Sequence, residues 1–149
     1  MFAMSENGRC SENFLCPKEN LNKGGIKKQK VTVLVVDDSP LIIVKISELL
    51  EDVENISLLP SCGTYKDALH LLSQIQPDVI LLDINLPDKS GIQLLTYIKS
   101  SFHNTVVIMY TNHANNYYSQ LCYTLGANYF VDKSKDFEKI PLFISSLNT

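Results

Sequence analysis

The sequence predicts an α/β fold with a doubly wound, five-stranded parallel sheet that carries helices on both faces. Short apolar runs alternate five times with amphipathic segments between residues 31 and 147. These runs are continuously apolar, which is typical of strands buried on both faces of a parallel sheet. Because crossovers between parallel strands are right-handed, a doubly wound arrangement is the natural one.

Boundary signals agree with this alternation. Ser39 is placed to cap the helix after the first strand, and Thr64 with Asp67 resembles a capping box. Gly126 is expected to stop the fourth helix, and Pro141 to disturb the first turns of the fifth. Strands are predicted over residues 31–36, 56–59, 79–82, 105–110 and 129–131. Helices are predicted over residues 40–52, 64–76, 114–125 and 137–147, with one more starting after Gly91.

Length and composition indicate a single domain. The chain has 149 residues, of which 45% are hydrophobic, enough for one buried core. The net charge of −3 gives no electrostatic reason to expect contact with DNA. No apolar run approaches the roughly 18 residues that a membrane span needs, and residues 1–10 do not resemble a secretory signal. We therefore expect a cytoplasmic protein without membrane contact.

Residues 1–30 differ in composition from the rest of the chain. They are rich in Ser, Glu, Asn, Lys and Gly, and their one apolar cluster is Phe14-Leu15. This composition predicts a disordered tail over residues 1–30 and a folded domain over residues 31–149. The alternative is a short peptide that docks through Phe14 and Leu15 on the domain or on a partner.

Polar side chains follow four of the five predicted strands. Asp37 and Asp38 follow the first strand, Asp83 the third, Thr111 the fourth and Lys133 the fifth. The carboxyl ends of parallel strands meet at one edge of the sheet, where such folds place their sites. Three neighbouring carboxylates would raise one another's pKa values unless a cation lay among them. A hard divalent cation that prefers oxygen ligands, Mg²⁺, is the expected partner.

This combination of groups suits phosphoryl transfer. Such transfer needs an in-line nucleophile, a metal and donors for the phosphoryl oxygens. A carboxylate that acts as the nucleophile forms an acyl phosphate. Asp83 is the best candidate, because it is central and is followed by a turn, Asn85-Leu86-Pro87-Asp88. Asp88 itself is expected to form the turn or to cap a helix.

Four segments carry a resemblance to a known family. They are VLVVDDSP (33–40), VILLDINLPDKSG (79–91), VVIMYTN (106–112) and GANYFVDKS (126–134). In this order and at this spacing, the chain resembles the receiver domain of bacterial two-component response regulators over residues 31–147. That family's sheet is flavodoxin-like, with strand order 2-1-3-4-5.

The resemblance implies a role for each residue at the strand ends. Asp83 would be the phosphoacceptor, phosphorylated in the presence of Mg²⁺ by a sensor histidine kinase or a phosphotransfer protein. Thr111 and Lys133 would bind phosphoryl oxygens. The implied Mg²⁺ ligands are the carboxylates of Asp37, Asp38 and Asp83 and the backbone carbonyl of Asn85.

The resemblance also implies a conformational switch, formed by Thr111 and Phe130. Their movement would change the surface of the fourth helix, fifth strand and fifth helix, which an unidentified downstream protein would read. Tyr117, Tyr118 and Tyr123 are candidate contacts on this surface, although partial burial in the core explains them equally well. A monomer, or a weak dimer on phosphorylation, is expected.

The chain ends at Thr149, just after the last predicted helix. We therefore expect a stand-alone receiver that acts by protein contact: a chemotaxis-type regulator, a relay intermediate or a phosphate sink. It would be a phosphoacceptor rather than an enzyme, apart from any catalysis of its own phosphorylation and dephosphorylation.

Three positions depart from the family's usual pattern. Ser134 stands where proline often follows the strand-five lysine, a change expected to affect mainly a turn. Asn112 stands where a small residue is common, and we expect it to slow phosphoryl access or hydrolysis. Phe130 replaces a frequent tyrosine, which favours a buried ring. His113 is expected to be an ordinary loop histidine.

Three other functions are alternatives to this one. The first is a pseudo-receiver that binds a partner without phosphorylation; the presence of all five chemical groups argues against it. The second is an aspartyl-phosphate hydrolase of the haloacid dehalogenase type. Neither Asp37-Asp38-Ser39 nor Asp83-Ile84-Asn85 matches the DxDx[TV] strand end of those enzymes. Flavin binding on the same topology would need a Ser/Thr-rich phosphate loop after the first strand, which the sequence lacks.

Overall fold

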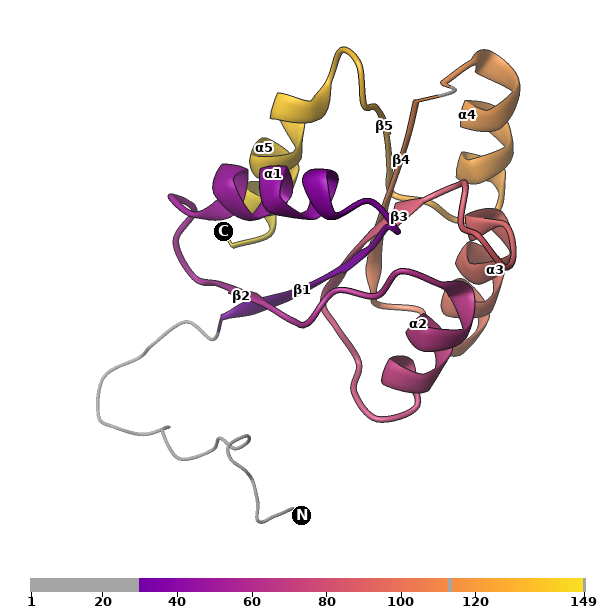
Figure 1. Cartoon of the computed structure of the whole chain (residues 1–149), viewed down its shortest axis with the longest axis horizontal. Coiled ribbons are helices and arrows are strands. Elements are labelled where there is room, and N and C mark those ends of the chain that lie inside the picture. The colour runs from indigo at the N-terminus through magenta and orange to yellow at the C-terminus, as the bar shows by residue number, and fades with distance from the viewer. Residues whose placement is uncertain (1–29, 113, 149) are drawn as a thin grey trace.

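A parallel sheet of five strands forms the centre of the molecule, in the order β2-β1-β3-β4-β5 (Figure 1). Its strands are β1 (Val31–Val36), β2 (Ile56–Leu58), β3 (Val79–Asp83), β4 (Val106–Thr111) and β5 (Tyr129–Asp132). The computed structural model describes residues 30–112 and 114–148. The expected tail and His113 therefore lie outside the described residues. The predicted doubly wound fold and its strand order are confirmed.

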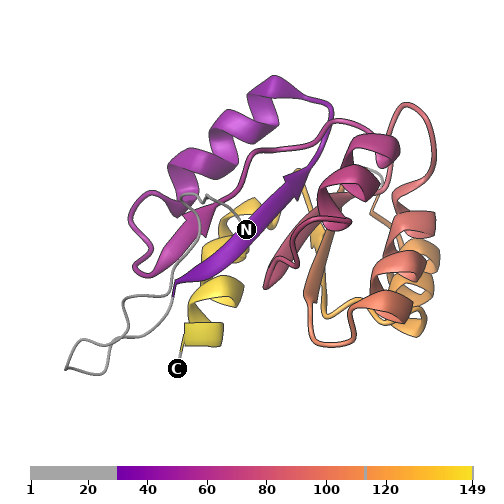
Figure 2. The ribbon, with the colours of Figure 1, turned by 90° about the horizontal axis from the view of Figure 1, so that it is seen from below.

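Helices cover both faces of this sheet. They are α1 (Pro40–Leu50), α2 (Tyr65–Leu72), α3 (Gly91–Ser101), α4 (Asn116–Thr124) and α5 (Ile140–Ser145). Figure 2 shows α1 on one side of the sheet and α2, α3 and α4 on the other. Among the described residues, no helix is both long and apolar enough to cross a membrane.

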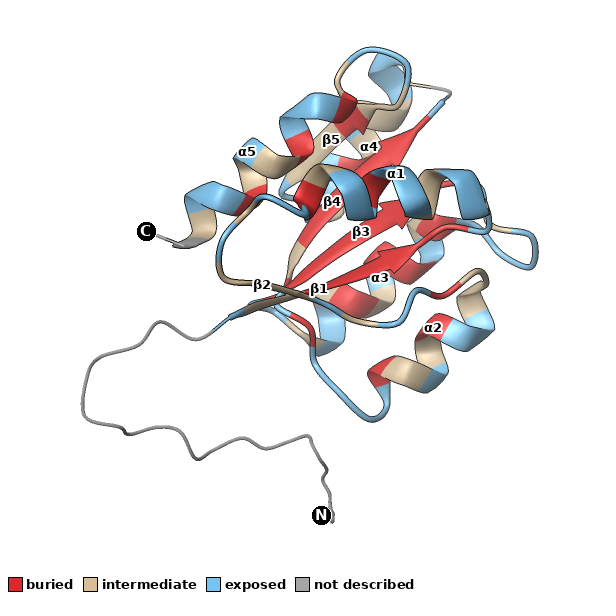
Figure 3. Cartoon of the chain, turned by 60° about the vertical axis from the view of Figure 1, so that its left-hand side comes forward, coloured by how far each residue is buried: buried red, intermediate tan, exposed pale blue. Residues whose placement is uncertain are grey.

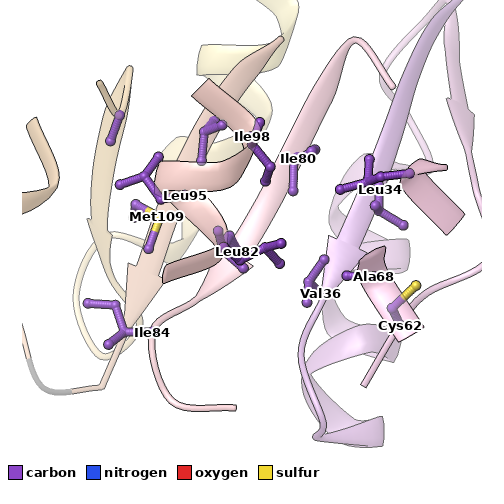
Figure 4. Close-up of a cluster of buried hydrophobic side chains, with 14 of the residues drawn as sticks. Leu34, Val36, Cys62, Ala68, Ile80, Leu82, Ile84, Leu95, Ile98 and Met109 are labelled. Atoms are coloured by element: carbon purple, nitrogen blue, oxygen red, sulfur yellow. The ribbon is translucent and has the colours of Figure 1, made fainter. Parts of the chain in front are cut away.

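Two hydrophobic cores result, one on each side of the sheet. Alternate side chains of β1 enter different cores: Leu34 joins the core under α2, α3 and α4 (Figure 4), and Val35 the core under α1 and α5. Both faces of the central strands are therefore buried (Figure 3), which explains their continuously apolar sequence. Each fully buried aliphatic side chain stabilises the fold by roughly 1.5–3 kcal/mol.

The predicted starts of α1 and α2 are confirmed, whereas α4 begins at Asn116, two residues later than predicted. The Ser39 hydroxyl accepts the Ile42 N–H at 3.4 Å, and the Thr64 hydroxyl accepts the Asp67 N–H at 2.9 Å. Gly126 follows α4 with a φ of 109°, a left-handed conformation that glycine adopts without strain.

Two predicted helix extents were wrong. The predicted helix over residues 64–76 ends at Leu72, where the Ser73 hydroxyl donates to the carbonyl of His70 at 2.6 Å. Local side-chain bonding of this kind competes with helix continuation. The last helix is shorter than predicted and is flanked by two 3₁₀ turns, Phe137–Lys139 and Ser146–Asn148. Pro141 lies in the first turn of α5, as expected, next to the change from the 3₁₀ turn to the α-helix.

Asp88 ties the loop between β3 and α3 to the start of α2. Its two carboxylate oxygens accept the backbone N–H groups of Tyr65 at 2.8 Å and Lys66 at 3.0 Å. These N–H groups belong to the first turn of α2 and have no partner within the helix. The hydrogen bond from Tyr65, followed by the others, lowers the pKa of Asp88 from its ordinary value. Asp88 is thus a helix cap, as expected, for a helix that precedes it in the chain.

Gly91, the first residue of α3, lies against the backbone of β3. Its N–H donates to the carbonyl of Ile84 at 2.6 Å. A Cβ atom added at Gly91 would overlap the carbonyl oxygen of Asp83 and lie 2.9 Å from its carbonyl carbon. Only glycine allows α3 to begin this close to the end of β3.

We expect Gly91→Ala to destabilise the protein by about 1–3 kcal/mol, because a clash between backbone-fixed atoms forces β3 and α3 apart. Urea unfolding measures this as a lower midpoint at an unchanged slope. Gly63→Ala is the matched control, since its added Cβ would meet nothing nearer than 3.6 Å. Equal midpoints for the two variants would contradict the close approach.

We expect Asp88→Asn to lower the melting temperature by a few degrees at pH 6. The folded pKa of Asp88 lies below its unfolded value of about 3.9, so the ionised carboxylate stabilises the fold above that pH. This stabilisation disappears as the pH falls through the lower folded pKa, and the two melting temperatures should then converge. Asp52→Asn, at an exposed position after α1, controls for the change of net charge. A difference that does not depend on pH would contradict this account.

Candidate functional site

Three carboxylates meet at the carboxyl end of the sheet. Asp37 and Asp38 follow β1, Asp83 ends β3, and one oxygen from each lies within 4.8 Å of the others. Asp37 and Asp83 are only 1% and 5% exposed, whereas Asp38 is open to solvent. Oxygen ligands of this kind, two buried and one exposed, fit Mg²⁺, which keeps several of its waters when bound.

Lys133 lies between two of these carboxylates. Its ammonium is 2.9 Å from Asp37 Oδ2 and 3.3 Å from Asp83 Oδ2, and its side chain is almost fully buried. Burial raises the pKa of Asp83 above its ordinary value, Lys133 lowers it, and the charge of Asp37 raises it further. Three ionised carboxylates and one ammonium leave two negative charges, which a divalent cation would neutralise.

The carboxylate of Asp37 is held by three donors. The Ser39 N–H donates to Oδ1 at 2.8 Å, and the Tyr110 hydroxyl donates to Oδ2 at 2.8 Å, beside the Lys133 ammonium. Burial, and then the nearby charge of Asp37, raise the pKa of Tyr110 well above its ordinary value, so its hydroxyl stays a donor. Sequence analysis missed Tyr110. The available signal was a hydroxyl in an apolar strand, since a buried tyrosine hydroxyl needs a partner.

Thr111 and Asn85 lie at the same end of the sheet as the acidic group, whereas Phe130 lies within β5, opposite Met109. Thr111 is the last residue of β4 and is fully buried, and its carbonyl accepts the Lys133 N–H at 2.9 Å. The Asn85 N–H donates to Asp83 Oδ1 at 3.3 Å, in the loop that would offer the Asn85 carbonyl. Phe130 is partly buried and packs against the core under α2, α3 and α4. The sequence-predicted site residues other than Phe130 therefore lie at this end of the sheet.

The turn after Lys133 is held by Asp132 rather than by proline. The Asp132 carboxylate accepts the backbone N–H of Ser134 at 2.9 Å and its hydroxyl at 2.6 Å. The Asp132 carbonyl accepts the N–H of Asp136 at 2.8 Å. These bonds fix the chain on both sides of Lys133, so the absence of proline leaves the lysine well positioned.

The tyrosines of α4 differ in exposure. Tyr117 is 69% exposed and Tyr123 is 49% exposed, whereas Tyr118 is partly buried against the core. The rings of Tyr117 and Tyr118 meet edge to face, with centroids 5.4 Å apart. Partial core burial thus explains Tyr118, and the other two present aromatic surface to solvent.

Comparisons with known proteins agree with this architecture. EvgA, a DNA-binding transcriptional activator of Escherichia coli (strain K12), is 28% identical over 112 residues, which are 74% of this chain and 53% of EvgA. A protein-glutamate methylesterase/protein-glutamine glutaminase of Clostridium acetobutylicum is 35% identical over 113 residues, 74% of this chain and 33% of that protein. The chain therefore spans about half, or less, of the length of these relatives.

Structural comparison gives the same result. The crystal structure of the Mn(2+)-bound form of response regulator Rcp1 aligns with a TM-score of 0.66 and 25% identity, over 78% of this chain and 90% of that one. A family model, described as the response regulator receiver domain, matches residues 33–144. The match covers most of the chain and contains every residue of the acidic group and Lys133. The chain therefore belongs to the response regulator receiver domain family of two-component systems.

Proposed function

We propose that this receiver domain accepts a phosphoryl group on Asp83 from a phosphohistidine, on a sensor histidine kinase or a phosphotransfer protein. The observation that carries the proposal is the meeting of Asp37, Asp38 and Asp83 within 4.8 Å, with the Lys133 ammonium between two of them. Asp37 and Asp38, with the carboxylate of Asp83 and the backbone carbonyl of Asn85, are the proposed ligands of Mg²⁺. The Mn(2+)-bound relative Rcp1 supports a divalent cation.

The reaction is a displacement at phosphorus. A carboxylate oxygen of Asp83 forms the new P–O bond while the P–N bond to the donor histidine breaks, and the imidazole leaves. Lys133 donates to one phosphoryl oxygen and Thr111 to another, which stabilises the charge that spreads over these oxygens. Bound Mg²⁺ supplies further neutralisation of that charge. Burial of Asp83 keeps most water away from the acyl phosphate.

Phosphorylation then shifts the population between two conformations. The Thr111 hydroxyl moves toward the phosphoryl group, and Phe130, already partly buried, packs further inward. The surface of α4, β5 and α5 changes and is read by a downstream protein in the cytoplasm. The exposed rings of Tyr117 and Tyr123 are the proposed contacts on it, because solvent-exposed aromatic rings are often used in protein interfaces.

We expect incubation with acetyl phosphate or carbamoyl phosphate and Mg²⁺ to add one phosphoryl mass to the wild type, measured by intact-protein mass spectrometry. Asp83→Asn should gain no mass, because the amide oxygen does not replace the nucleophilic carboxylate. Removal of Mg²⁺ with EDTA should abolish the gain in wild type. Asp52→Asn, far from the site in the turn after α1, is the matched control and should react like wild type.

Two outcomes would overturn the proposal in different directions. If wild type gains no mass while it is folded and Mg²⁺ is present, the domain is a pseudo-receiver. If wild type instead releases phosphate steadily from unrelated phosphate monoesters, it is a hydrolase.

We expect Asn112→Ala to lose its phosphoryl group several-fold faster than wild type. Asn112 is exposed and follows Thr111 directly, so a smaller side chain should open the path by which water reaches the acyl phosphate. The decay of the phosphorylated mass after removal of the donor measures this rate. Asn104→Ala removes an exposed amide beyond the opposite end of β4 and should decay like wild type. Equal lifetimes for wild type and Asn112→Ala would sink the idea.

A further inference from the structure

The Tyr110 hydroxyl makes a buried bond that the proposed chemistry does not use. Tyr110 lies in β4 opposite Asp83 of β3 and is fully buried in the core under α1 and α5. Its ring packs near that of Phe137, with centroids 6.3 Å apart. An apolar side chain would satisfy this packing. The hydroxyl at the end of the ring therefore needs a separate explanation.

The Tyr110 hydroxyl is one of three hydrogen-bond donors to the carboxylate of Asp37. An ionised carboxylate offers about four acceptor directions. Ser39 N–H takes one at Oδ1, and Tyr110 and Lys133 take two at Oδ2, at 2.8, 2.8 and 2.9 Å. One direction remains for a metal ion or for a water bound to it. Three donors from three different segments also prevent the carboxylate from rotating, so this last direction is fixed in space.

The Tyr110 ring also contacts Lys133, which is itself a partner of Asp37. The Lys133 ammonium is 4.6 Å from the ring centroid, within the range of a cation–π contact. The same ammonium is 3.3 Å from Asp83 Oδ2. When Lys133 turns to a phosphoryl oxygen on Asp83, its bond to Asp37 weakens or breaks. The Tyr110 hydroxyl is then the donor that stays on Asp37 Oδ2.

We propose that Tyr110 is a positioning residue that holds the carboxylate of Asp37 for Mg²⁺ and leaves Lys133 free to reach the phosphoryl group. The inference rests on the proposed magnesium site and deepens it. It assigns the hydroxyl to metal binding and the ring to support of Lys133. Removal of the hydroxyl alone should therefore weaken Mg²⁺ binding and leave phosphoryl transfer itself nearly intact.

The test is Tyr110→Phe, which keeps the ring and deletes the hydroxyl. Calorimetric titration with MgCl₂ should give a dissociation constant about tenfold higher than for wild type, the usual cost of losing a partner of a metal ligand. The Mg²⁺ concentration for half-maximal phosphorylation by acetyl phosphate should rise by the same factor. The maximal rate at saturating Mg²⁺ should stay close to that of wild type. Tyr97→Phe, which removes the hydroxyl of a partly buried tyrosine on α3, should change neither quantity.

A role in core packing alone predicts a different result. It would lower the melting temperature in EDTA and leave the Mg²⁺ dependence unchanged, so a dissociation constant within about twofold of wild type overturns the inference. If wild type also fails to bind Mg²⁺, that result contradicts the proposed metal site and, with it, this inference. Binding by wild type with unchanged binding by Tyr110→Phe overturns the inference alone.

A measurement on wild type covers the case in which Tyr110→Phe does not fold. With tyrosines labelled at Cζ, addition of Mg²⁺ should shift the NMR signal of Tyr110, whose hydroxyl is bonded to the metal ligand. The signal of Tyr97 should not move. An unchanged Tyr110 signal at saturating Mg²⁺ overturns the inference.

Discussion

The ion pair between Lys133 and Asp37 is the interaction on which the rest of this structure depends. Two buried carboxylates, Asp37 and Asp83, lie close together where water is scarce, and such charges are tolerated only when they are paired and hydrogen-bonded. The single ammonium touches both of them. One positive charge does not neutralise three carboxylates, and the remaining negative charge favours the binding of a divalent cation.

Packing of the two hydrophobic cores offsets the unfavourable repulsion between these carboxylates. Both faces of β1, β3 and β4 are covered by apolar cores, so the strand ends cannot drift apart to relieve the repulsion. The loops that carry the polar groups are fixed by bonds of their own. Asp88 ties the loop after Asp83 to α2, and Asp132 shapes the turn after Lys133. Stability at the cores thus maintains a locally unfavourable cluster, as is common at functional sites.

Sequence analysis predicted the fold and the candidate site because both depend on short-range patterns. A buried strand that ends in a polar residue is visible within ten positions, and parallel topology brings such ends together. The contacts that it missed join distant segments. Tyr110 lies 73 positions from Asp37, and Asp88 caps a helix that starts 23 positions earlier. No local pattern gives such pairings. The early end of α2 was missed for another reason, since the Ser73 hydroxyl competes with the helix at short range.

The paired strands β4 and β5 connect the candidate site to the exposed surface. Thr111 and Lys133 lie at their ends, while Phe130 pairs in register with Met109 two positions below Thr111. In the proposed switch, a shift of Thr111 would therefore pass to β5, the strand that carries Phe130 and leads into Lys133. The side chains of α4 contact the same pair of strands from one face. Relatives of quite different lengths and activities share this domain. In the proposed function, the partner would recognise exposed residues such as Tyr117, while the buried carboxylates and Lys133 would carry out the phosphoryl transfer.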